Sequence, residues 1–170
     1  TGELIISVVD GIWFSSDTLE RFWNHYQENP KACIGGVGNQ YEYNFEKKQF
    51  GALVWKDPRL RTNYGSFWEI KPIDLELCMT SIPRQAILDC GGVDEIYDQG
   101  AAISEKEMCL RIDKLGYQFF LDSSLEYKAI KHPRLHGEKE WNEHYEISCK
   151  LLEKHILEIN NGTRLKLNYL

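Results

Sequence analysis

The 170-residue sequence predicts an α/β fold in which helices flank a mixed sheet. Residues 3–10 form a short apolar run rich in β-branched side chains, which is typical of a central strand covered on both faces. Strand-like and helix-like segments then alternate along the chain, ending in a long helix. No internal repeat or second domain boundary interrupts the pattern, so residues 1–170 are expected to form a single domain.

The next segments predict a helix, a strand and a loop. Asp17 and Glu20 have the spacing of a capping box, and apolar residues then repeat at helical spacing. Residues 32–43 predict a strand with a bulge at its glycines, followed by a turn near Asn44. Residues 50–64 are irregular and rich in aromatic and basic side chains, which predicts a long surface loop. Such a loop either binds a ligand or is a solvated excursion.

The middle of the chain predicts a strand and two helices. Residues 67–79 alternate well enough to form a strand. Pro83 is expected at the first position of a short helix, which ends at glycines 91–92 because glycine readily adopts positive φ. Ser104 is expected to cap the next helix, and Gly116 to end it.

The C-terminal part predicts strands at 117–121 and 125–130 and a long helix at 138–159. His132 and His136 lie between the last strand and this helix. A pair of histidines four residues apart in a loop is weak evidence for a metal site, since surface histidines are common.

Composition and charge exclude several classes of function. A formal charge of -6 leaves no basic stripe for binding nucleic acid. The apolar runs are far shorter than the ~20 residues that cross a bilayer, so no transmembrane segment is expected and the protein is expected to be soluble. Five widely spaced cysteines without a CxxC pair predict buried, reduced thiols and therefore a cytoplasmic location.

Two carboxylates are candidates for chemistry. Asp10 ends the first strand, where ligands of open α/β sheets bind, and it could hold Mg²⁺ or Mn²⁺ together with phosphate oxygens. The alternative is an ordinary turn residue. Glu105 begins a helix and could act as a general base. The alternative is that acidic residues favour the first helical turn because of the helix dipole.

Four segments occur in an order that is informative as a set. Residues 2–10 with 17–20 are a strand leading to an acid and then a helix, and residues 80–95 hold an arginine, a short helix and a Gly-Gly-Val-Asp-Glu run. Residues 104–117 hold an acidic helix start with a later arginine, and His132 follows the last strand. Together they resemble the second half of a family 2 glycosyltransferase, an inverting enzyme of the GT-A fold. The resemblance covers residues 1–136, which leaves 137–170 as a C-terminal helix and tail.

This resemblance implies transfer of a sugar from a nucleotide-diphosphate donor to a hydroxyl of a glycan or related acceptor. It implies that Glu105 is the catalytic base, where the family usually has an aspartate, and that Asp10 and His132 are metal ligands. A divalent cation, Mn²⁺ or Mg²⁺, is implied, although Asp10 is the only acid left of the family's Asp-x-Asp motif. The expected substrate-binding residues are Arg84, Trp68, Asp94 and Ser104. Basic residues of the 50–64 loop are an alternative to Arg84 for contacting phosphates.

Family members carry a nucleotide-binding half before the metal motif, and this chain begins at that motif. The resemblance therefore implies that the N-terminal nucleotide-binding strands are missing or supplied by another polypeptide. A sheet with such an exposed edge is expected to aggregate or to form a homo-oligomer. Two other functions remain open: a non-catalytic module that binds a sugar or nucleotide sugar on the same fold, and an α/β interaction domain unrelated to sugars.

Overall fold

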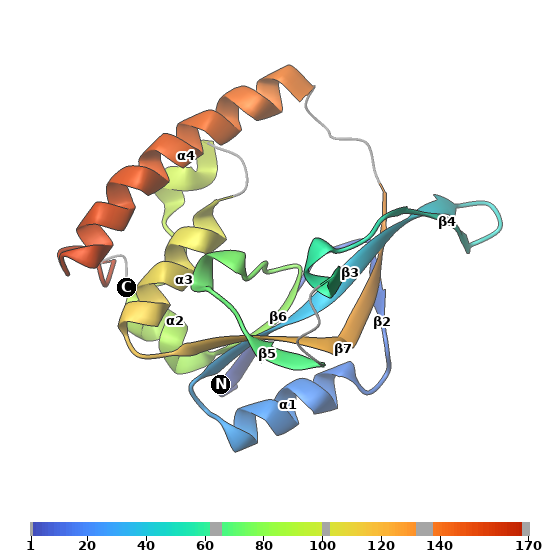
Figure 1. Ribbon diagram of the computed structural model, residues 1–170, viewed down its shortest axis with the longest axis horizontal. Coiled ribbons are helices and arrows are strands. Elements are labelled where there is room, and N and C mark those ends of the chain that lie inside the picture. The colour runs from blue at the N-terminus through green and yellow to red at the C-terminus, as the bar shows by residue number, and fades with distance from the viewer. Residues whose placement is uncertain (1, 62–65, 100–102, 132–137, 168–170) are drawn as a thin grey trace.

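A computed structural model describes residues 2–61, 66–99, 103–131 and 138–167, and it confirms a mixed sheet flanked by helices (Figure 1). The strands are β1 (Leu4–Val8), β2 (Ile12–Phe14), β3 (Ala32–Asn44), β4 (Gln49–Trp55), β5 (Phe67–Glu69), β6 (Met79–Pro83) and β7 (Gln118–Ile130). The helices are α1 (Thr18–Glu28), α2 (Arg84–Cys90), α3 (Ser104–Lys114) and α4 (Glu138–Asn160). Short 3₁₀ turns lie at Pro58–Arg61, Pro72–Asp74 and Glu95–Gln99.

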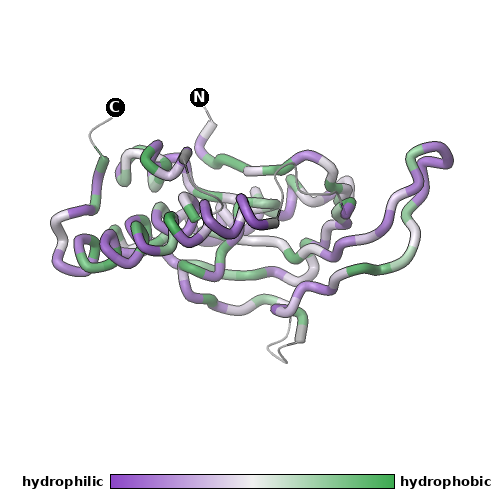
Figure 2. The backbone as a smooth tube through the Cα atoms, turned by 90° about the horizontal axis from the view of Figure 1, so that it is seen from above, coloured by the Kyte–Doolittle hydropathy of each residue, from purple (hydrophilic) through white to green (hydrophobic). Residues whose placement is uncertain are grey.

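The sheet has the order β1-β6-β3-β7-β2, with β4 paired to β3 and β5 paired to β7. The central strands β3 and β7 run parallel, and the other pairs are antiparallel. Phe22 of α1 packs into one core cluster, while α2 and α3 supply Ala86, Met108 and Ile112 to another. The hairpin of β3 and β4 projects from the body of the molecule and has a hydrophilic tip (Figure 2).

The predicted bulge in β3 is confirmed, because its register against β7 shifts between Gly35 and Val37. A Cβ atom on Gly36 would overlap the carbonyl oxygen of Leu125, so only glycine permits this close approach. The same shift explains why β7 reads as two strands in the sequence. The alternation of side chains breaks there, although the strand is continuous.

Two predicted elements are wrong, and one strand was not predicted. Residues 50–64 are not one long loop, because Gln49–Trp55 forms β4; register shifts against β3 disturb the alternation that would have revealed it. Residues 67–79 are not one strand, because Pro72 begins a 3₁₀ turn between β5 and β6. The three-residue strand β2 escaped prediction because it is too short to show a period.

The helix ends confirm the positive φ angles expected of the glycines, but they correct the predicted N-caps of α1 and α3. Gly91, Gly92 and Gly116 all have positive φ, as expected. Ser104 is the first residue of α3 and not its cap, since Ile103 occupies the cap position and no side chain caps the helix. Asp17 does precede α1, but its carboxylate accepts a hydrogen bond from the Ser15 hydroxyl and none from the helix backbone.

Candidate active site

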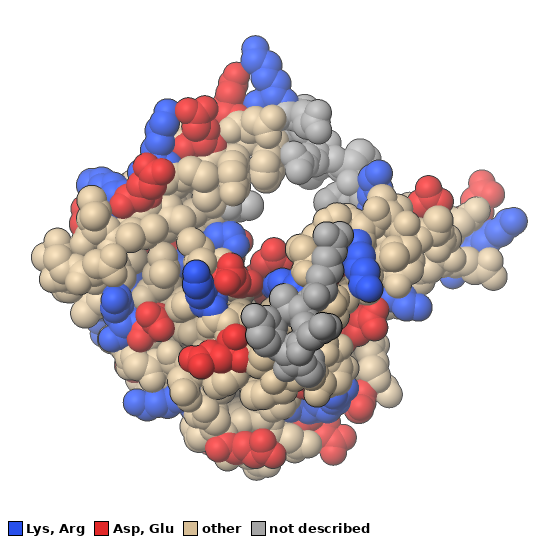
Figure 3. Space-filling view, viewed as in Figure 1, with Lys and Arg blue, Asp and Glu red and all other residues tan. Residues whose placement is uncertain are grey.

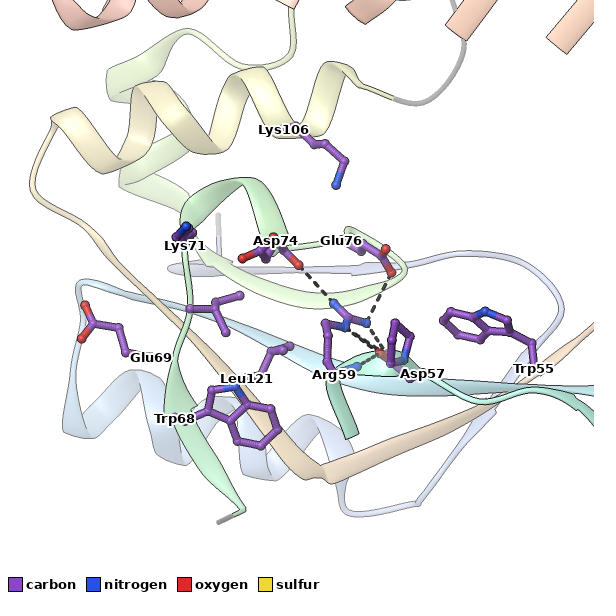
Figure 4. Close-up of a pocket in the computed structure, with 12 residues that line it drawn as sticks. Trp55, Asp57, Arg59, Trp68, Glu69, Lys71, Asp74, Glu76, Lys106 and Leu121 are labelled. Atoms are coloured by element: carbon purple, nitrogen blue, oxygen red, sulfur yellow. Dashed lines mark hydrogen bonds and ion pairs between the residues drawn. The ribbon is translucent and has the colours of Figure 1, made fainter. Parts of the chain in front are cut away.

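Two adjoining cavities lie where β1, β4 and the start of α3 come together. The first has a volume of about 480 Å³ and the second about 290 Å³, and both are lined by Trp55 and Glu76. Figure 4 shows the first cavity, with Trp55 and Trp68 on its walls and the amino group of Lys106 above it. Acidic and basic side chains mix around the hollow in the middle of the face shown in Figure 3. The cavities therefore combine aromatic surfaces with charges of both signs.

An ion-pair network fixes one wall of the first cavity. The Arg59 guanidinium lies 2.5 Å from the Asp57 carboxylate and 3.3 Å from that of Glu76, and it donates to the Asp74 carbonyl oxygen at 3.2 Å. Burial raises the pKa of Asp57, but the hydrogen bonds from Arg59 outweigh this effect and hold that pKa below its ordinary 3.8. Asp57 is therefore an anion, and Arg59 is held in one place.

Asp10 lines the second cavity at a corner of the backbone. The preceding N–H, of Val9, donates to the Cys78 carbonyl oxygen at 3.0 Å, and the Gly11 carbonyl oxygen accepts from Ile130 at 3.0 Å. Gly11 itself has a φ of +69°, which allows the sharp turn into β2. Asp10 and Glu76 thus line one cavity from two segments of chain.

Glu105 lies half-buried in the first turn of α3 and lines neither cavity itself. The pKa of Cys78, which lines the second cavity, is raised by burial, by the charge of Glu76 and, more weakly, by that of Glu105. Lys106, the residue after Glu105, lines the first cavity, and its amino group donates a hydrogen bond to the Ile73 carbonyl oxygen at 2.9 Å. The structure therefore places Asp10 at the second cavity and the residue after Glu105 at the first.

A buried ionic cluster lies behind the start of α3. Glu107 and Arg111 pair at 2.8 Å with fully buried side chains, and Arg164 of the C-terminal tail donates to Glu107 at 2.8 Å. Asp94 is also buried in this cluster, where it pairs with Arg164 and accepts the Ile96 N–H at 3.0 Å. The cluster connects the tail to the helix that carries Glu105.

The other sequence-predicted site residues separate into two groups. Trp68 lines the first cavity, and Ser104 adjoins Glu105 at the start of α3. Asp94 and Arg84 line neither cavity. Arg84 is exposed at the far end of β6 from Asp10, because its N–H donates to the carbonyl oxygen of Glu3, which is seven residues or about 23 Å from Asp10 at ~3.3 Å per residue. The structure therefore does not bring Arg84 or Asp94 together with Asp10.

The structure describes only part of the region that was expected to bind a metal. His132 and His136 lie outside the described residues. The N–H of Ile130, two positions before His132, donates a hydrogen bond to the Gly11 carbonyl oxygen. Within the described ranges, no group of three or more His, Cys, Asp or Glu side chains assembles as a metal site. No helix in those ranges is long and apolar enough to cross a membrane.

Sequence reasoning missed Asp57 and Glu76. Their neighbour Arg59 was among the basic residues expected to contact phosphate, but no local signal marks either acid. Each lies in an irregular segment, so only the folded chain shows that both surround Arg59.

The comparisons with known proteins bear on the fold. No protein family matches the sequence, and no curated protein does either. The crystal structure of GalNAc-T7 with UDP, GalNAc and Mn²⁺ is similar, with a TM-score of 0.59 and 11% sequence identity. The match covers 88% of this chain and 31% of that chain, so this chain spans about a third of that structure's length. The chain therefore has a GT-A-like glycosyltransferase fold.

Proposed function

We propose that this chain is the C-terminal half of an inverting, family 2-like glycosyltransferase, which moves a sugar from a nucleotide-diphosphate donor to a hydroxyl of a glycan. One observation carries the proposal: Asp10 lines the second cavity, and Glu105 precedes Lys106, which lines the adjoining first cavity. The similar fold of GalNAc-T7, crystallised with UDP, GalNAc and Mn²⁺, supports the general part of this proposal, sugar transfer from a nucleotide donor. A nucleotide-binding half, preceding this chain or in another polypeptide, would hold the donor base and ribose.

Glu105 would act as the general base. The acceptor oxygen bonds to the anomeric carbon while its proton passes to the Glu105 carboxylate. The bond to the diphosphate breaks on the opposite side, and its electron pair leaves on the phosphate oxygen. Attack opposite the leaving group inverts the anomeric carbon. Trp55 and Trp68 offer flat apolar surfaces for sugar rings in the first cavity.

Asp10 and Glu76 would hold a divalent cation, with His132 as a further ligand. The carboxylates fit this role because both line the second cavity and because carboxylate oxygens suit Mn²⁺ and Mg²⁺. When bound, such an ion would balance the charge that develops on the leaving diphosphate. Lys106 would add positive charge from the neighbouring cavity.

The location and the division of the chain are also proposals. All five cysteines are free and three are buried, which supports a reducing compartment such as the cytoplasm. Residues 1–136 would carry the transferase part of one domain. Residues 137–170 would brace it, since Arg164 bonds to Glu107 and Leu167 to Cys90.

The test compares Glu105→Gln with the native sequence, each in a protein that also contains the proposed nucleotide-binding half, and all binding and turnover are measured on that protein. Binding of UDP-glucose, UDP-N-acetylglucosamine, UDP-galactose and GDP-mannose is measured by calorimetry with and without Mn²⁺, and donor hydrolysis is measured in parallel. We expect the substitution to lower turnover ~10²- to 10⁴-fold while donor affinity stays unchanged. Asp113→Asn, an exposed acid in the last turn of the same helix, is the matched control. Native turnover in Glu105→Gln would overturn the base assignment.

The second candidate function is a non-catalytic sugar or nucleotide-sugar binding module. It is favoured by the sequence, in which Asp10 is the only acid that corresponds to the Asp-x-Asp motif. Nucleotide-sugar binding without hydrolysis in the native chain would select this function. Absence of binding to all four donors, with and without Mn²⁺, would overturn both candidates.

A further inference from the structure

A row of aromatic side chains lies along the projecting hairpin and the neighbouring strand β2. Phe50 is central to it, with ring centroids 4.9 Å from Trp13, 5.1 Å from Tyr43 and 5.7 Å from Tyr41. Phe45 extends the row toward the tip, 5.0 Å from Tyr43. These five residues, Trp13, Tyr41, Tyr43, Phe45 and Phe50, are called the aromatic row.

Trp13 is held rigidly but remains open to solvent. Its ring stacks on Tyr43 at 5.3 Å with an angle of 28° between the planes, and it meets Phe50 edge to face. Yet 43% of Trp13 is exposed. A large aromatic side chain that is fixed by its neighbours loses little conformational freedom when a ligand binds.

Polar side chains surround Trp13. A cavity of about 330 Å³ is lined by Trp13, Phe14, Ser15, Phe50, Glu126 and Lys128. This volume is in the ~300–1,000 Å³ range of small-molecule sites. Glu126 accepts a hydrogen bond from Asn39 at 2.7 Å, and the Lys128 amino group lies 5.7 Å from the centres of the Tyr41 and Phe50 rings. Both charged groups are therefore positioned beside the aromatic surface.

The aromatic row is separate from the candidate active site. Trp13 pairs with Lys128 across β2 and β7, and the adjacent pair is Ile12 with Ala129. Ile12 and Ala129 line the second cavity of the candidate active site. Because successive side chains point to opposite faces of a strand, Trp13 and Lys128 face away from that cavity.

The chemistry of this surface fits a sugar better than a protein or a nucleic acid. Cores of protein interfaces are depleted in Lys and Glu, whereas here Glu126 and Lys128 line the cavity next to Trp13. The formal charge of -6 opposes nucleic acid. A sugar ring has an apolar face that can stack on an indole, and hydroxyl groups at its rim that can bond to a carboxylate and an ammonium group.

We propose that the aromatic row is a second saccharide-binding site, which takes a neutral, linear oligosaccharide with one ring stacked on Trp13. Further rings of the chain follow the row along the hairpin. The site holds a glycan on the reverse side of the sheet from the candidate active site, and its binding does not depend on sugar transfer.

The test follows the five tryptophan indole N–H signals by nuclear magnetic resonance, each assigned with a Trp→Phe variant. Cellohexaose, maltohexaose and chitohexaose are the probes. We expect at least one of them to shift the Trp13 signal until saturation. Trp23, which is 41% exposed on α1, is the matched control, and its signal is expected to stay in place. Lys128→Met is expected to weaken binding while the other indole signals show that the fold is intact.

Two results would overturn this proposal. One is that none of the three oligosaccharides shifts the Trp13 signal. The other is that the signal moves with protein concentration in the absence of saccharide, which would assign the row to a contact between copies of the chain. Nucleotide-sugar binding and donor hydrolysis are read separately, so failure of the proposed function is distinguishable from failure of this site.

Discussion

Arg111 is a fully buried cation, and the residues around it balance its charge and accept its hydrogen bonds. It pairs with Glu107, and its guanidinium donates to the carbonyl oxygens of Cys90 and Gly92. In the sequence this pair reads as an ordinary i, i+4 pair on a helix. Glu146 and Lys150 on α4 have the same spacing and a similar separation of 2.8 Å, but their side chains are 68% and 72% exposed. Burial, which spacing does not reveal, separates the two pairs.

Arg111→Ala is expected to lower the free energy of unfolding by ~3–5 kcal/mol, because Glu107 would remain buried without this partner. Urea denaturation measures the change. Lys150→Ala is the control and is expected to leave stability unchanged, because water already solvates both Lys150 and its partner Glu146. Equal midpoints for the two variants would contradict this account of the buried pair.

Individual site residues show how far sequence reasoning reaches. Asp10 and Glu105 were predicted from their positions at the end of a strand and the start of a helix; Asp10 lines the second cavity, whereas Glu105 lines neither. Arg84 also begins a helix, yet it lies at the other end of β6. Local sequence describes the type of position, but it does not say which positions meet in space.

The C-terminal tail packs against the end of α2 through one tight contact. Gly91 has a φ of +80°, and a Cβ atom there would overlap the Leu167 carbonyl oxygen and lie 2.8 Å from the Leu167 nitrogen. The Leu167 N–H donates to the Cys90 carbonyl oxygen at 3.0 Å. The neighbouring Gly92 has a φ of +81° but no atom within 4 Å of such a Cβ atom.

Gly91→Ala is therefore expected to destabilise the protein more than Gly92→Ala. In each variant, holding alanine in the left-handed backbone conformation costs ~1–2 kcal/mol of stability. Only Gly91→Ala also displaces the C-terminal tail. Thermal unfolding of the two variants measures the difference. If both lose the same stability, Leu167 does not pack on Gly91 as described.

The molecule as a whole has an open edge. β1 has β6 on one side and ends the sheet on the other, and Ile5 and Val8 on this strand are exposed. An exposed apolar edge strand pairs readily with another chain, because its backbone hydrogen-bonding groups are unpaired. Self-association, which was predicted from the sequence, stays a prediction.

We expect the chain to associate with itself as its concentration rises. Val8→Lys is expected to weaken that association, because it places a charge on the edge strand. Analytical ultracentrifugation measures both. Val8 is 44% exposed. The control is Leu157→Lys on α4, at a side chain that is 69% exposed but lies on a helix without an open backbone. Equal association in the two variants would exclude the β1 edge as the contact.

The sequence by itself determined the α/β class, the bulged strand β3, the extent of α4 and the positive-φ glycines, because these depend on periodicity and on residues that interrupt it locally. Only the tertiary structure decided that Gln49–Trp55 is a strand, that Asp94 is buried with Arg164, and that Asp10 and Glu76 line one cavity. The physical reason is that strand pairing, burial and the assembly of a site depend on contacts between segments far apart in the chain, and no local pattern records those contacts.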